Sequence, residues 1–173
     1  LSYVFSRDNT SAESPPLTAS FGTTGTATAG TDFTASDVGS VTFGLGASSA
    51  TVSIDPTADT IVEPDESVIL TLTSGAGYSV GSPSTATGFI RNDDSSVISV
   101  AVSPVSIQED ATGALTFTFT RDDTSSETPG LSVNFLTVGT AMPVTDYVAS
   151  ATGSVNFAAG SETATVTIDP VAD

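Results

Sequence analysis

The sequence of 173 residues contains no cysteine, no histidine and no lysine. Without cysteine the chain forms no disulfides and has no thiol nucleophile. Without cysteine and histidine it cannot build the usual zinc sites or a Ser-His-Asp triad, and it lacks the easiest general base near neutral pH. Without lysine it cannot form Lys–Asn isopeptide crosslinks. These absences lead us to expect a protein that is not an enzyme.

Positive charge is scarce as well. Acidic residues outnumber basic ones by 20 to 3, and the formal net charge is −17; the three bases are Arg7, Arg91 and Arg121. Binding of nucleic acid or of an anionic membrane surface requires a basic surface, so we expect neither partner. No apolar run is long enough to insert into a bilayer. Cations are the natural partners of such a chain.

Small and β-branched residues dominate what is present. Thr, Ser, Ala, Gly and Val are abundant, and the first residues, LSYVFSR, predict a strand rather than a signal peptide. This composition is typical of an acidic secreted β-protein. We therefore expect an extracellular or cell-surface location.

The chain contains an internal repeat. Residues 1–21 match residues 115–135, and ATVSIDPTAD at 50–59 matches ATVTIDPVAD at 164–173. The offset of 114 is constant, no gap is needed, and about half of the aligned positions are identical. Two copies of one fold from a tandem array explain this pattern.

The phase of the repeat predicts two incomplete copies. The segment 98–114 has no counterpart before Leu1, and residues 60–94 have none after Asp173. We expect one repeat at 1–95 that lacks its first strand and a second at 96–173 that lacks its last strands. Either the chain is a window on a longer polymer, or copies of itself or neighbouring repeats complete the open ends.

Short alternating runs separated by Gly, Pro, Asp and Ser predict strands throughout. In SATVSID, Ala50, Val52 and Ile54 face one way while the intervening Ser and Thr residues face the other. No segment has a helical period. We predict an all-β fold of tandem Ig-like antiparallel β-sandwiches, with about seven strands in each.

Acidic residues concentrate in connections between the predicted strands. DPTADTIVEPDE, at 55–66, holds five carboxylates in twelve residues and no base. Together with Asp32, and with Asp93 and Asp94 at the repeat boundary, these residues can meet at one pole of a sandwich. Oxygen donors from several loops suit Ca²⁺, and the absence of His and Cys disfavours softer metals. Solvated loop carboxylates remain the alternative.

The motifs GTATAGTDF, GSVTF, VEPDESVILTL and GSPSTATGFIRNDD resemble, in this order, the Calx-β motif of sodium–calcium exchangers, integrin tails and large bacterial surface proteins. The resemblance covers essentially the whole chain. It implies a seven-stranded Ig-like sandwich that binds calcium at one pole. The metal ligands that it implies are Asp32, Asp59, Ile61 through its carbonyl, Glu63, Glu66, Asp93, Asp94, Glu109, Asp110, Asp146 and Asp173.

The chain also departs from the exchanger pattern. Consecutive aspartates are replaced by Ala58-Asp59-Thr60, and Asn92 stands in place of a third aspartate. Fewer charges predict fewer ions or weaker binding.

Three functions follow as hypotheses. The first is a structural calcium-binding repeat of an extracellular fibre or large surface adhesin, in which calcium rigidifies the joint between repeats. The second is a filament subunit assembled by strand donation between neighbours. The third is an adhesin domain that binds a glycan or a protein. Glycosidase chemistry needs two carboxylates in a sugar cleft, which a tandem sandwich with short loops does not offer.

Overall fold

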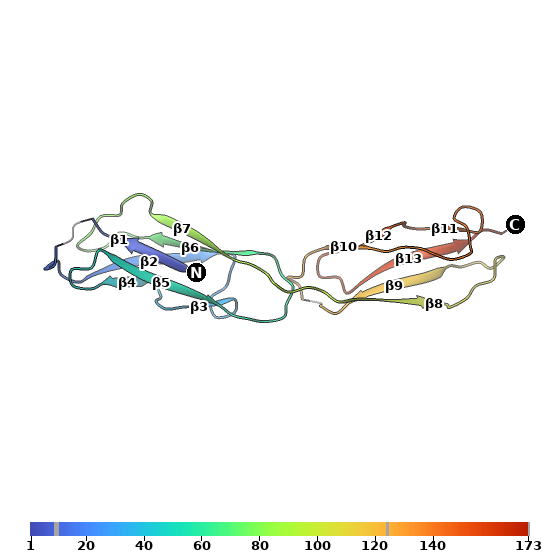
Figure 1. Cartoon of the computed structure of the whole chain (residues 1–173), viewed down its shortest axis with the longest axis horizontal. Coiled ribbons are helices and arrows are strands. Elements are labelled where there is room, and N and C mark those ends of the chain that lie inside the picture. The colour runs from blue at the N-terminus through green and yellow to red at the C-terminus, as the bar shows by residue number, and fades with distance from the viewer. Residues whose placement is uncertain (9–10, 124, 173) are drawn as a thin grey trace. The chain divides into compact units, whose positions relative to one another are not determined.

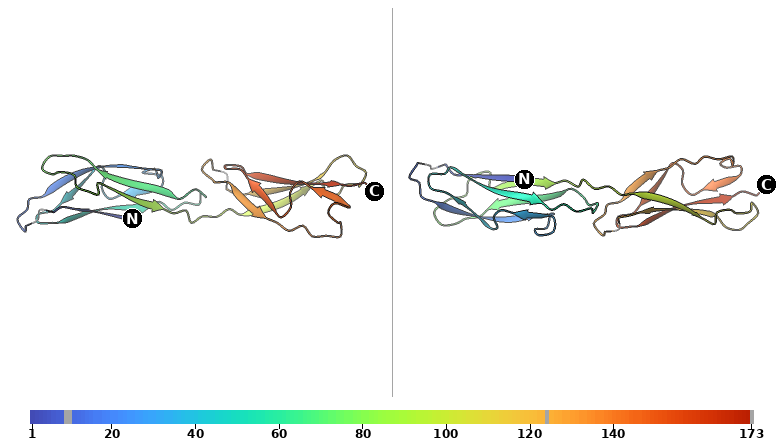
Figure 2. Two further views of the ribbon diagram at one scale, coloured as in Figure 1. Left: turned by 90° about the horizontal axis from the view of Figure 1, so that it is seen from above. Right: turned by 60° about the horizontal axis from the view of Figure 1, so that its bottom comes forward.

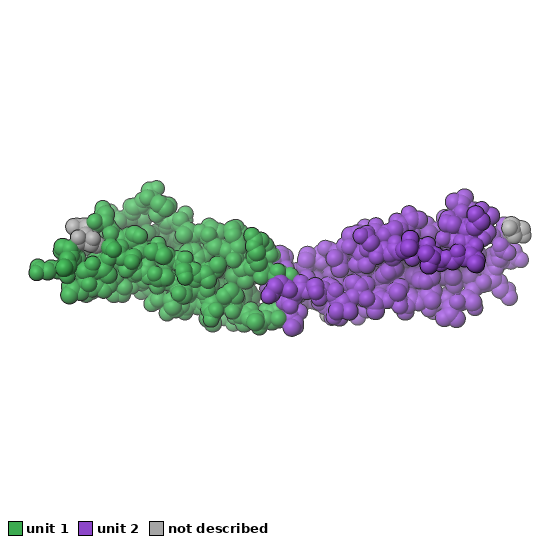
Figure 3. All heavy atoms as spheres, viewed as in Figure 1, with its two compact units in different colours: residues 1–59, 65–92 green, residues 60–64, 93–173 purple. Residues whose placement is uncertain are grey.

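The computed structural model describes residues 1–8, 11–123 and 125–172. The described residues form strands and connections and contain no α-helix. This part of the chain therefore has no helix that is long and apolar enough to cross a membrane. The chain divides into two compact units, one of Leu1–Asp59 and Asp65–Asn92, the other of Thr60–Pro64 and Asp93–Asp173 (Figure 3).

The first unit contains two antiparallel sheets with the strand orders β1-β5-β3 and β4-β2-β6-β7 (Figure 1). Its strands are β1 (Ser2–Ser6), β2 (Leu17–Gly25), β3 (Phe33–Ala35), β4 (Ser40–Phe43), β5 (Ser49–Pro56), β6 (Glu66–Leu72) and β7 (Thr85–Ile90). Strand β2 pairs with β4 through its first half and with β6 through its second.

The second unit has sheets of order β11-β13-β9-β8 and β10-β12 (Figure 2). Its strands are β8 (Ile98–Ser103), β9 (Leu115–Arg121), β10 (Leu131–Asn134), β11 (Tyr147–Ala149), β12 (Ser154–Phe157) and β13 (Thr163–Pro170). The offset of 114 relates β9 to β1, β10 to β2, β11 to β3, β12 to β4 and β13 to β5. The register is preserved, because Ser2 pairs with Ser53 and Thr116 with Thr167.

Each unit is closed by a core that both of its sheets supply. In the first unit Val52 and Ile54 of β5 are buried in one cluster with Val68 and Leu70 of β6. Burying each such side chain contributes about 1.5–3 kcal/mol. The alternation of SATVSID and VILTLT thus puts one apolar face of each sheet inside. The prediction of tandem all-β sandwiches is confirmed.

Strands β3 and β11 were not expected from the sequence. Each has three residues and pairs with the end of a long strand, β5 or β13. Three residues are too few to show an alternating pattern. Partner strands, rather than local propensity, therefore define β3 and β11.

An arginine clamp, one side chain that binds three backbone carbonyls, holds the loops of the second unit. Arg121 donates from Nε to the carbonyl of Ser161 (2.6 Å), from Nη1 to that of Pro129 (2.9 Å) and from Nη2 to that of Ala158 (3.2 Å). Its guanidinium carbon lies 5.6 Å from the centre of the Phe157 ring. The residue is 1% exposed, so these bonds replace its hydration.

The first unit repeats this clamp with Arg7, whose donors reach the carbonyls of Ala47, Pro15 and Gly44 at 2.6, 2.9 and 3.2 Å. Arg7 is only half-buried. In the second unit, Nε of Arg121 also lies 4.0 Å from Oδ1 of Asp123, but backbone carbonyls are the main partners of this arginine.

The clamps predict different costs for the same substitution. Arg121→Met removes a buried side chain that donates to three backbone carbonyls and should cost about 3 kcal/mol. In Arg7→Met, water can replace the half-buried donors that are lost, so this substitution should cost about 1 kcal/mol. Native-state hydrogen exchange of amides in each unit measures both losses. Equal losses in the two units would contradict this account.

Candidate functional site

The loop before β3 holds Asp32 in a fixed conformation. Its Oδ2 accepts a hydrogen bond from the backbone N–H of Thr28 (2.6 Å), and its own N–H donates to the Thr28 carbonyl (2.9 Å). Its carbonyl accepts from the N–H of Thr57, just beyond β5 (2.9 Å). The motif GTDF therefore places a half-buried carboxylate where β5 enters the acidic connection.

The second unit builds the same loop around Asp146. Its Oδ2 accepts from the N–H of Met142 (2.7 Å), and its carbonyl accepts from the N–H of Val171 (2.9 Å). One residue type differs in a way that matters for the backbone. Gly30 has a φ of +89°, and its counterpart Val144 has a φ of +73°, a value that a β-branched residue rarely adopts.

Three acidic side chains come together at the loop that holds Asp32. Asp32, Glu63 and Glu66 each place one carboxylate oxygen so that all three oxygens lie within 4.8 Å of one another. Glu63 lies on the connection between β5 and β6, and Glu66 is the first residue of β6. All three are half-buried, and Oε2 of Glu66 is shielded from solvent.

The donor set fits a hard divalent cation. All three side chains offer oxygen, and two oxygens bound to one Ca²⁺ at 2.3–2.6 Å are at most about 5 Å apart. A span of 4.8 Å therefore allows all three carboxylates to contact the same ion. Mg²⁺ demands a tighter octahedral shell and keeps more of its water, so this spacing suits calcium better.

One carboxylate of the acidic connection has a different role. Asp65 accepts from Nη1 of Arg91 through Oδ2 and from the N–H of Asn92 through Oδ1 (3.2 Å). The expectation that this connection lacks any compensating base is therefore wrong for Asp65. Arg91 follows the last residue of β7, and the antiparallel pairing of Glu66 with Ile90 brings it to Asp65. That register is a property of the folded sheet, and no pattern in the sequence identifies the pair.

The remaining predicted ligands lie outside the group of three, and their assignment stays a prediction. Those that are exposed are Asp59, Ile61 (42% exposed), Asp93, Glu109 and Asp110. Asp94 and Asp146 are half-buried, and Asp173 lies outside the described residues.

Exchanging glycine and valine at Gly30 and Val144, the equivalent positions of the two aspartate loops, should have opposite effects on stability. A side chain at positive φ costs about 1–2 kcal/mol, while glycine loses about 0.5–1 kcal/mol of backbone entropy. Val144→Gly should thus raise the stability of the second unit by up to about 1 kcal/mol. Gly30→Val should lower that of the first by a similar amount, although no atom lies within 4 Å of the added Cβ. Urea denaturation checks both, and a loss in Val144→Gly would refute the strain.

Two of the solved structures that are similar to this chain are crystal structures of CBD12 domains. The crystal structure of CBD12 from CALX1.2 is similar to this chain, with 22% sequence identity and a TM-score of 0.46. The match covers 99% of this chain and 69% of the CALX1.2 chain. The crystal structure of the calcium binding domain CBD12 of CALX1.1 has 21% identity and a TM-score of 0.46, over 100% of this chain and 69% of that one. No curated protein sequence matches the chain.

The family model of the Calx-beta domain matches twice, at residues 17–94 and 91–173. These matches confirm the resemblance found in the sequence, and the chain belongs to the Calx-beta domain family.

Proposed function

We propose that this chain is a non-catalytic calcium-binding repeat module. The observation that carries the proposal is the convergence of Asp32, Glu63 and Glu66 within 4.8 Å. Membership of the Calx-beta family supports it, because calcium binding at one pole of the sandwich is what that family implies. The residues that would hold the ion are these three, with Asp59 and the carbonyl of Ile61 as further oxygen donors from the same connection.

Electrostatics explains what the ion would do. Two unit charges at this spacing repel by about 3 kcal/mol in a medium of effective dielectric constant about 20. A divalent cation turns that repulsion into attraction and links the loop before β3 to the beginning of β6. The hydrogen bond from Thr28 to Asp32 holds one of the carboxylates in place before the ion arrives.

The module belongs, in this proposal, to an extracellular fibre or large surface adhesin. The net charge of −17 and the tandem repeat support that setting. Calcium then has a mechanical role as well. Asp93 and Asp94 lie in the short linker RNDDSS, and neutralising them stiffens the joint between repeats.

Calcium titration of matched variants tests the site. Glu66→Gln keeps the size of the side chain and removes one charge, so the affinity for Ca²⁺ should fall at least tenfold by isothermal titration calorimetry. Glu13→Gln removes one charge from an exposed loop of the same unit and should leave the affinity within twofold. The site assignment fails if the two variants bind calcium equally well, or if the wild-type chain binds none at millimolar concentration.

Chelation tests the mechanical role. At a calcium concentration of about 100 times the dissociation constant, binding adds about 2.7 kcal/mol to the folded state, so EDTA should lower the melting temperature. In ¹⁵N relaxation, the order parameters of residues 91–96 should fall on chelation. Order parameters that stay constant while the melting temperature falls would leave calcium binding intact and refute the stiffening of the joint.

A further inference from the structure

Asp65 lies in the acidic connection but does not belong to the group of three carboxylates found within 4.8 Å of one another. Its oxygens have other partners: Oδ2 accepts from Nη1 of Arg91, and Oδ1 accepts from the backbone N–H of Asn92 (3.2 Å). Arg91 and Asn92 are the first two residues of the linker RNDDSS, at 91–96. One carboxylate thus binds both a side chain and the backbone where the linker begins.

Asp65 is also the neighbour of a proposed calcium ligand. Glu66 is the first residue of β6 and pairs with Ile90, the last residue of β7. The contact between Asp65 and Arg91 lies one position beyond this pair, so it continues the β6–β7 pairing into the linker. An ion that fixes Glu66 therefore also restrains the backbone that presents Asp65.

The ion pair of Asp65 and Arg91 is too exposed to act mainly through stability. The two side chains are 44% and 76% exposed, and ion pairs of this kind contribute little to the free energy of unfolding because water screens them. A carboxylate that accepts from two consecutive residues restricts the backbone instead. The contact of Asp65 is thus suited to positioning the chain where it leaves β7.

A second carboxylate binds the other end of the linker. Oδ2 of Asp123 accepts from the hydroxyl of Ser96. The side chain of Asp123 is 10% exposed, and its Oδ1 lies 4.0 Å from Nε of the buried Arg121. Among the described residues no donor reaches this Oδ1, so the charge of Arg121 is what compensates it. A carboxylate held in this way is a strong acceptor for the Ser96 hydroxyl.

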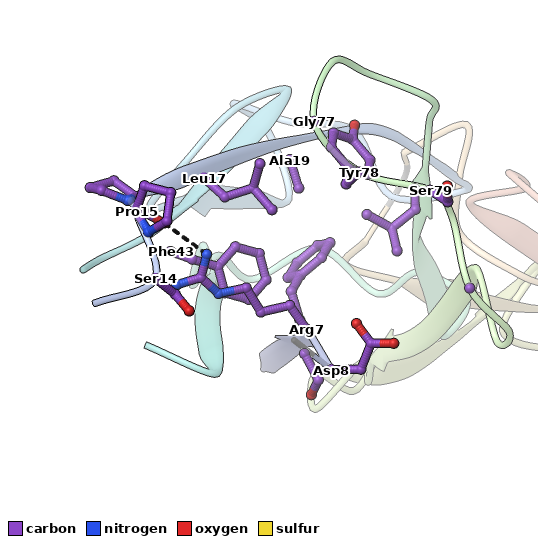
Figure 4. Close-up of a pocket in the computed structure, with 15 residues that line it drawn as sticks. Arg7, Asp8, Ser14, Pro15, Leu17, Ala19, Phe43, Gly77, Tyr78 and Ser79 are labelled. Carbon is purple, nitrogen blue, oxygen red and sulfur yellow. Dashed lines mark hydrogen bonds between the residues drawn. The ribbon is translucent and has the colours of Figure 1, made fainter. Parts of the chain in front are cut away.

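The arginine clamp does not require the carboxylate of Asp123. Arg7 binds three carbonyls of the first unit in the same way, and Figure 4 draws its bond to Pro15. By the offset of 114, the residue that corresponds to Asp123 in the sequence of the first repeat is Asn9. The clamp is thus built without an aspartate in one repeat, which leaves the linker contact as the specific role of Asp123.

We propose that Asp65 couples the proposed calcium site to the linker, and that Asp123 holds the far end of the linker whether or not calcium is bound. The first part rests on the proposed function. Without the ion, repulsion among the three carboxylates loosens the beginning of β6, and the contacts of Asp65 loosen with it. With the ion, Glu66 is held in place, and Asp65 restrains Arg91 and Asn92.

Two substitutions break the contact with opposite changes of charge. Asp65→Ala removes a negative charge, whereas Arg91→Ala removes a positive one. A loss of linker order that both variants share is therefore not an effect of net charge. Asp55→Ala removes a negative charge from an exposed position of the same connection and is the matched control.

Relaxation of ¹⁵N nuclei in the 173-residue chain, without calcium and at saturating calcium, measures the order parameters of residues 91–96. Calcium should raise them equally in the wild-type and Asp55→Ala chains. In Asp65→Ala and Arg91→Ala the rise should be less than half as large. The melting temperature of the calcium-free chain should change little in these two variants, because the ion pair is exposed.

Two further measurements need no ion. In the calcium-free chain, the amide of Asn92 should exchange faster in Asp65→Ala than in the wild type, because its acceptor is lost. Asp123→Asn, which introduces the residue that the first repeat has at this position, should lower the order parameter of Ser96 with and without calcium.

The outcomes separate this inference from the calcium site itself. If Asp65→Ala gains as much linker order on calcium binding as the wild type, the coupling is refuted, although calorimetry still shows that calcium binds. An unchanged Ser96 in Asp123→Asn refutes the anchor at the far end of the linker. A wild-type chain that binds no calcium overturns the calcium site and the coupling together.

Discussion

Mutual repulsion among the carboxylates of Asp32, Glu63 and Glu66 is the constraint on which the account of this protein depends. Three oxygens within 4.8 Å, all on half-buried side chains, are costly for a chain with a net charge of −17. The backbone brings them together regardless: a hydrogen-bonded loop holds Asp32, and the first residue of β6 carries Glu66. A bound cation that offsets the repulsion among these three carboxylates would explain why the fold keeps them together.

The repeat shows which features the scaffold conserves and which it changes. Both units keep the strand register, the arginine clamp and the hydrogen-bonded aspartate loop. They differ in the strands around this frame, since β9 pairs with both β13 and β8, whereas in the described residues β1 pairs with β5. The same arginine is therefore buried in one unit and half-buried in the other, so neighbours rather than residue type decide its environment.

Much of this could be predicted from the sequence. Period-two alternation predicts the long strands because burial of one face requires it, and the repeat predicts that β9 to β13 follow β1 to β5. Clustered acids predict the region of the site. The pairing of Arg91 with Asp65 could not be predicted, because it depends on the register of β6 and β7, which are 26 residues apart at that contact. The positive φ of Val144 could not be predicted either. Valine favours extended backbone, and only the loop around Asp146 imposes the positive φ.

Long-wavelength anomalous diffraction from crystals grown with calcium tests the central claim most directly. The account predicts one peak among the carboxylates of Asp32, Glu63 and Glu66, with six to eight oxygens at 2.3–2.6 Å. A map without a peak there, with these side chains turned apart into solvent, would contradict it. The tandem β-sandwich would then remain, with the acidic connection serving solubility alone.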